Sequence, residues 1–120
     1  MTPLTQLPGV LDAFVGRMNA QPRLTALLKN WQPDFRVEVR DADAGYRFVF
    51  RDGRVDCVEP VRDEPQDRTL LLRGDATTLH AMFSGELNPL HAHSDGLIEI
   101  YGSEKDQIKL DTIVLIVWGT

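Results

Sequence analysis

At 120 residues the chain has the size of one domain, which we expect to span residues 1–120 with one core and room for a modest cavity. Its net charge of −5 opposes nonspecific binding to nucleic acid and to anionic lipid surfaces. The lone Cys57, the lack of a signal-like N-terminus and a longest apolar run of only 113–118 predict a soluble protein of the reducing cytoplasm.

Two amphipathic helices are expected before residue 34. Apolar residues recur at helical spacing from Leu7 to Met18, which predicts the first helix. Pro22 interrupts this pattern, and a second stripe runs from Leu24 to Trp31 until Pro33 stops it.

From residue 34 the hydrophobic period becomes two, which predicts strands over residues 35–39 and 46–51. Asp52-Gly53 is a strong hairpin signal, so residues 54–59 should pair back as a third strand of an antiparallel meander. A polar loop over 60–67 precedes a fourth strand over 68–73, whose apolar run predicts an interior position.

The remaining elements are a helix, a strand and an ambiguous segment. Asp75 can cap a helix over 76–84, and residues 97–101 should form the fifth strand. Ser103 and Asp106 resemble a capping box, whereas the β-branched residues of 113–117 favour a sixth strand. We predict a helix over 106–117, buried because it is apolar nearly all round.

These elements predict an α+β fold with a five-stranded, mainly antiparallel sheet whose apolar face is covered by helices. The charged face should carry an arginine strip, which we define as Arg36, Arg40, Arg47 and Arg51. We interpret the strip as solvated surface paired with Glu38, Asp56 or neighbouring acids, in preference to a docking site for an acidic partner or a lipid headgroup.

The most specific signal lies in residues 84–102. A helix stop leads into Gly85-Glu-Leu-Asn-Pro89, and Gly96 and Gly102 bracket the fifth strand. The chain here resembles the sterol carrier protein 2 (SCP2) sterol-binding domain family, whose pattern is a helix, Gly-x-Leu-Asn-Pro, Gly-x-Leu-x-Ile-x-Gly and a closing helix. The resemblance implies a lipid tunnel, an apolar cavity between helices and sheet. It also implies binding of sterols, fatty acids, fatty acyl-CoAs or isoprenoid lipids without chemistry.

Two departures from the family pattern bear on that tunnel. His93 and Ser94 stand where the family usually has an aromatic residue and a methionine, so the tunnel should be more polar there. The charged residues 103–106 follow the second glycine motif and argue against ligand contact by this turn.

Adaptable apolar side chains together with this resemblance predict a ligand site. An ordinary dry core would use the same residue types. The predicted site residues are Phe14, Met18, Phe48, Met82, Phe83, Leu87, Ile100, Ile113 and Val117.

No catalytic constellation emerges, and we expect no enzyme, cofactor or metal. His91, His93 and Asp95 form the only metal-like cluster, but an H-x-H pair shares a face only in extended backbone and here it follows Pro89 in a turn or helical segment. Cys57, with no histidine nearby in sequence, is expected to be a small buried hydrophobe.

The sequence therefore favours a non-catalytic carrier of an apolar lipid, with transient membrane contact, over two alternatives. The first is a closed-cavity interaction module that acts in a larger assembly. The second is a metal-dependent enzyme built on His91, His93 and Asp95. The identity of the lipid and the oligomeric state stay open.

Overall fold

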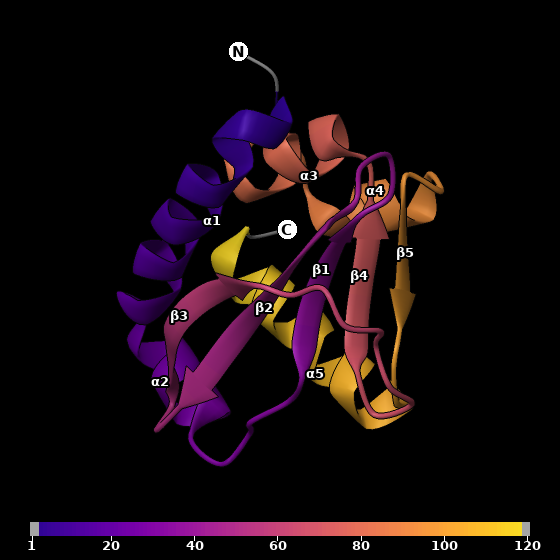
Figure 1. Ribbon diagram of the computed structural model, residues 1–120. Helices are drawn as coiled ribbons and strands as arrows, with labels where there is room; N and C mark the ends of the chain where they lie inside the picture. Colours follow the sequence, from indigo (N-terminus) through magenta and orange to yellow (C-terminus); the bar gives the residue numbers. More distant parts are fainter. Residues whose placement is uncertain (1–2, 119–120) are drawn as a thin grey trace.

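The computed structural model describes residues 3–118 and places five helices on one side of a five-stranded sheet (Figure 1). It therefore has the predicted α+β class. In chain order the elements are α1 (Pro3–Asn19), α2 (Pro22–Leu28), β1 (Phe35–Val39), β2 (Ala44–Arg51), β3 (Arg54–Pro60), β4 (Leu70–Gly74), α3 (Ala76–Phe83), α4 (Pro89–Ser94), β5 (Ile98–Tyr101) and α5 (Glu104–Val117).

The strands lie in the order β3-β2-β1-β4-β5. The meander β1–β2–β3 is antiparallel, as predicted, and β4 is interior, as predicted. However, β4 runs parallel to β1, with Phe35 beside Leu70, so the sheet is mixed. The parallel pairing arises because the β3–β4 connection crosses in front of the sheet before the chain turns into β4 (Figure 1).

The sheet separates an apolar inner face from a charged outer face. Strand alternation directs Phe35, Val37 and Val39 inward, while Arg36 and Glu38 face outward. The inner face packs against α1, whose stripe Leu7, Leu11, Phe14 and Met18 is buried as the sequence predicted. Helix α2 is shorter than expected: it ends at Leu28, and Trp31 closes a turn through its N–H to the Leu28 carbonyl, at 3.0 Å.

A two-residue turn joins β2 and β3, as the Asp-Gly signal predicted. Arg51 pairs with Arg54, and both Asp52 (φ 51°) and Gly53 (φ 82°) have the positive φ of a type I′ turn. The sequence did not show the bulge that follows: Val55 pairs with Phe50 but Cys57 pairs with Val49, so Asp56 is an extra residue in β3. The bulge shifts the alternation, and Cys57 is exposed; the expectation that Cys57 is buried was wrong.

The start of α3 is capped by a residue from another element. The main-chain N–H of Ala76 donates to Asp41 Oδ1 at 3.0 Å, across 35 residues of sequence. Asp75 occupies the N-cap position but makes no side-chain capping bond; it pairs with Arg40 at 3.1 Å instead, so the predicted cap was wrong. Local sequence favoured Asp75 because it directly precedes the helix. The cap by Asp41 depends on the β1–β2 turn lying close to the start of α3, which local sequence does not show.

The last segment is a helix, α5, and not a sixth strand. Ser103 Oγ accepts from the Asp106 N–H at 3.1 Å, which is the predicted cap. The helix is not buried on all sides: Leu110, Ile113 and Val114 are buried, whereas Ile108 is 59% exposed and Leu115 45% exposed. Within residues 3–118, no helix combines the length and the apolarity needed to cross a membrane.

We predict that Gly53→Ala destabilises the protein by more than about 1 kcal/mol in a denaturant titration, because it strains a positive φ and places a Cβ 2.8 Å from the Thr25 carbonyl oxygen. The matched control is Gly16→Ala in α1, which meets nothing within 4 Å. This control should stabilise the protein by about 0.5–1 kcal/mol. Equal effects of the two changes would contradict the close packing of the turn against α2.

Candidate functional site

An apolar cavity lies between the sheet and the helices. Its volume is about 30 Å³. Side chains from α1, the sheet and α5 form its wall, and α3 and the start of α4 close one end. Every wall residue is apolar. The wall residues are Phe14, Met18, Trp31, Phe35, Phe50, Leu72, Met82, Phe83, Pro89, Leu110, Ile113, Val114 and Trp118.

Aromatic rings form a continuous cluster around this cavity. All five phenylalanines and both tryptophans of the chain belong to it. Phe14 is central: its ring centroid lies 5.0 Å from that of Phe83 and 4.9 Å from that of Trp118. Such tilted and edge-to-face contacts add to the burial of the ring surfaces and hold the helices against the sheet.

Trp118 closes the cavity from the end of α5. Its indole Nε1 donates to the Met82 carbonyl oxygen at 2.8 Å, so it joins the end of α5 to the end of α3. Leu110, Val114 and Trp118 recur every four residues and share one side of the helix. Sequence reasoning missed Trp118 because the predicted helix stopped at residue 117, although this spacing could have identified it.

The structure brings together five of the nine predicted site residues in the cavity wall: Phe14, Met18, Met82, Phe83 and Ile113. Phe48 is buried behind the wall, with its ring centroid 6.3 Å from that of Phe14. Leu87, Ile100 and Val117 are half-buried against the core outside the wall. The period-two pattern of apolar residues in the predicted strands could have added Phe35, Phe50 and Leu72 to the predicted site, because it places them on the inner face of the sheet.

The size of the cavity decides what it can hold as it stands. About 30 Å³ accommodates one small group such as a methyl or a water molecule. Sites for drug-sized ligands occupy roughly 300–1,000 Å³. Binding of a lipid therefore requires wall side chains to move, and Trp118, which follows the last residue of α5, is only half-buried.

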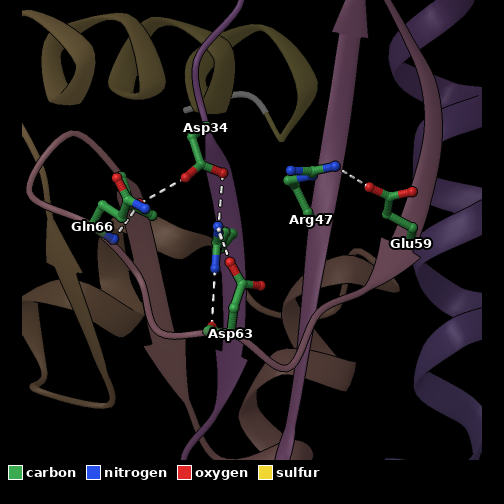
Figure 2. Close-up of polar contacts among 7 residues, drawn as sticks. Asp34, Arg47, Glu59, Asp63 and Gln66 are labelled. Carbon is green, nitrogen blue, oxygen red and sulfur yellow. Dashed lines mark hydrogen bonds and ion pairs between the residues drawn. The ribbon is translucent and has the colours of Figure 1, made fainter.

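The outer face carries a second, polar hollow of about 470 Å³, between the β1–β2 turn and residues 61–65 of the β3–β4 connection. Arg36 anchors this connection: its guanidinium donates to Asp34 at 3.0 Å and to the Asp63 carbonyl oxygen at 3.1 Å (Figure 2). Arg36 is only 5% exposed, so its predicted solvation was wrong. The cause is the connection lying over β1, which local sequence does not reveal.

Asp34 accepts hydrogen bonds from Arg36 Nε at 3.0 Å and from Thr69 Oγ1 at 2.8 Å. Burial raises the pKa of the Asp34 carboxyl, but the hydrogen bonds from Arg36 and Thr69 and the charge of Arg36 outweigh burial and hold this pKa below its ordinary value of 3.8. The carboxylate is thus ionised at neutral pH and compensates the buried guanidinium.

Every member of the arginine strip has a carboxylate partner. Arg36 pairs with Asp34 and Asp63, Arg40 with Asp75 and Glu99, Arg47 with Glu59 and Arg51 with Asp56. Glu38, expected to pair with the strip, pairs with Arg73 at 2.8 Å. All four arginines of the strip are therefore paired within the chain, which leaves little charge for an acidic partner.

His91 and His93 lie two residues apart in α4, so they project from different sides of a helix. Both are exposed, as is Asp95. Among residues 3–118, no group of three or more histidine, cysteine, aspartate or glutamate side chains is placed to hold a metal ion.

Comparison with known proteins identifies the family. A model of the SCP-2 sterol transfer family matches residues 12–113, so the chain belongs to this family. No curated protein sequence matches the chain significantly.

Solved structures show the same fold. A crystal structure of sterol carrier protein 2 has a TM-score of 0.64 at 16% identity, covering 92% of this chain and 95% of that one. A conserved hypothetical protein of Thermus thermophilus, a candidate sterol carrier, has a TM-score of 0.63 at 17% identity over 92% of this chain and 85% of its own. A sec-alkyl sulfatase matches 89% of this chain over 15% of its length, with a TM-score of 0.63 and 15% identity.

We predict that Asp34→Asn lowers the free energy of unfolding at pH 7 by about 1–3 kcal/mol, because it removes the nearer of the two carboxylates that compensate the buried Arg36. Since folding lowers the pKa of Asp34, its stabilisation is complete above 3.8 and is lost as pH falls through the folded pKa. The difference between variant and wild type should therefore shrink by about pH 3 in urea titrations. Asp43→Asn, an exposed control that joins none of the ion pairs among the described residues, should change stability little at either pH.

Replacing both His91 and His93 by alanine should leave the melting temperature unchanged, with or without a chelator. Both side chains are exposed, and a metal at a hundredfold excess over its dissociation constant would add about 2.7 kcal/mol to stability. Stoichiometric zinc or iron in the purified wild type, lost in the double variant, would contradict this prediction.

Proposed function

We propose that residues 1–120 act as a non-catalytic lipid carrier, which binds the apolar part of a sterol, fatty acyl or isoprenoid lipid between the helices and the sheet. The observation that carries the proposal is the cavity wall, which is apolar throughout and lies between the two layers. Membership of the SCP-2 sterol transfer family supports the same reading. Uptake and release then involve a transient contact with a membrane.

The energetics favour such a ligand once the cavity opens. Each methylene transferred from water contributes about 0.8 kcal/mol, so ten methylenes offset several kcal/mol of side-chain rearrangement. The two wall methionines, Met18 and Met82, are flexible and polarizable and can repack around ligands of different shape. The ligand is then held by shape and burial, without a covalent step.

A second candidate function is a closed-cavity interaction module in a larger assembly. The cavity volume of about 30 Å³ is the observation that favours it, because a module of this kind needs no space for a ligand. The arginine strip supports it less, since all four arginines are already paired within the chain. A copurifying lipid in native mass spectra of freshly purified protein would favour the carrier, and its absence the module.

The carrier should bind a fluorescent fatty acid or polyisoprenoid analogue with a dissociation constant in the micromolar range. Phe83→Asp should abolish this binding, because it places a charge in the apolar wall between α1 and α5. The measurement is a fluorescence titration with a melting curve recorded for each variant.

The matched control is Ile108→Asp on the exposed side of α5, which should bind like wild type. Binding that survives in Phe83→Asp would remove Phe83 from the ligand site. Absence of saturable binding of fatty, sterol and isoprenoid probes to wild type would reject the carrier.

A further inference from the structure

Trp118, like Trp31, differs from the phenylalanines of the cavity wall in how it is held, because both tryptophans are half-buried and lie outside the helices and strands. Phe14 and Phe83 lie within helices and are almost completely buried, at 3% exposure each. Trp118 follows the last residue of α5 and is only half-buried. Its withdrawal breaks one indole bond and one main-chain bond to Val114, and leaves α5 otherwise intact.

The contacts of the indole describe the space that it fills. Its ring lies 4.9 Å from Phe14 at a tilt of 33°, and 6.2 Å from Phe83 at 60°. Its Nε1 donates to the Met82 carbonyl oxygen at 2.8 Å. The space is therefore shaped for a flat aromatic ring with one hydrogen-bond donor at its edge.

We propose that Trp118 is an internal ligand, whose indole occupies the position taken by the head ring of the bound lipid. The preferred lipid is then phenolic: an aromatic ring that carries a hydroxyl donor and an apolar tail. This inference rests on the proposed carrier function and specifies its ligand class. When the lipid binds, its phenol ring replaces the Trp118 indole as the aromatic hydrogen-bond donor, and the indole leaves the cavity.

Two features of the wall distinguish a phenolic ring from a saturated one. The faces and edges of Phe14 and Phe83 interact with the π system of an aromatic partner, which a cyclohexyl ring lacks. The Met82 carbonyl oxygen accepts from the Gly85 N–H at 3.1 Å and from Trp118, which matches its two lone pairs. A ring without a donor leaves the second lone pair unmatched in an apolar wall.

The exchange also sets the apparent affinity. Lipid binds only the fraction of molecules in which Trp118 has withdrawn, so the apparent dissociation constant is the intrinsic value divided by that fraction. Weakening the hold of residue 118 increases the fraction. Trp118→Phe keeps a ring but removes the N–H donor to Met82, and it should tighten lipid binding.

The first test uses wild type labelled with 5-fluorotryptophan, whose two fluorine NMR signals come from Trp31 and Trp118 and are assigned with Trp118→Phe. The probes are 4-hexylphenol, hexylbenzene and hexylcyclohexane, which differ in the donor and then in the π system. We expect the phenol to bind about tenfold more tightly than hexylcyclohexane, with hexylbenzene between them. The Trp118 signal should move toward its solvent-exposed position at saturation, more than that of Trp31.

The second test compares the affinity of 4-hexylphenol for two variants. Trp118→Phe should bind at least about threefold more tightly than wild type. Val55→Ala, a core change in β3 outside the cavity wall, is the control for general loosening and should bind like wild type. Equal tightening in both variants would overturn the inference.

The outcomes separate the two proposals. Saturable binding of all three probes with equal affinity, or binding that leaves the Trp118 signal in place, overturns the internal ligand but retains the carrier. Absence of binding of every probe to wild type and to Trp118→Phe overturns the internal ligand, and the carrier is rejected with it only if the fatty, sterol and isoprenoid probes also fail to bind. Preference for the phenol with displacement of Trp118 supports both.

Discussion

The rest of the structure depends on one constraint, the need to cover the apolar inner face of a five-stranded sheet. An uncovered face with Phe35, Phe48 and Phe50 would expose large aromatic side chains to water. Helices α1 and α5 meet this need through Phe14 and Trp118, and the resulting aromatic cluster is also the wall of the cavity. The side chains that stabilise the core are therefore the same ones that line the cavity.

The two faces of the sheet are held by different kinds of interaction. On the inner face, aromatic and methionine side chains can repack because few directional bonds hold them. On the outer face, Arg36 is fixed by Asp34 and Asp63, and this network holds the connection that brings β4 in parallel to β1. The outer face is thus held by ion pairs, whereas the inner face is held by apolar packing.

The sequence alone determined most of the elements and the family pattern. Period-two and helical patterns predicted the five strands, α1 and α5, and Asp52-Gly53 predicted the tight hairpin, because such signals depend on neighbours along the chain. The motifs around Asn88-Pro89 and Gly96 to Gly102 pointed to the family that the comparison then identified. Five of the predicted site residues also fell in the cavity wall.

Tertiary structure alone decided the features that join distant segments. The parallel β1–β4 pairing, the burial of Arg36 beneath residues 61–65 and the cap of α3 by Asp41 depend on the path of the β3–β4 connection and the β1–β2 turn. The bulge at Asp56 reversed the expected burial of Cys57, since one extra residue moves every later side chain to the other face. The volume of the cavity could not be predicted from the sequence either, because it depends on where Trp118 packs against Phe14 and Met82. The same apolar residues can line an open tunnel or fill a closed core.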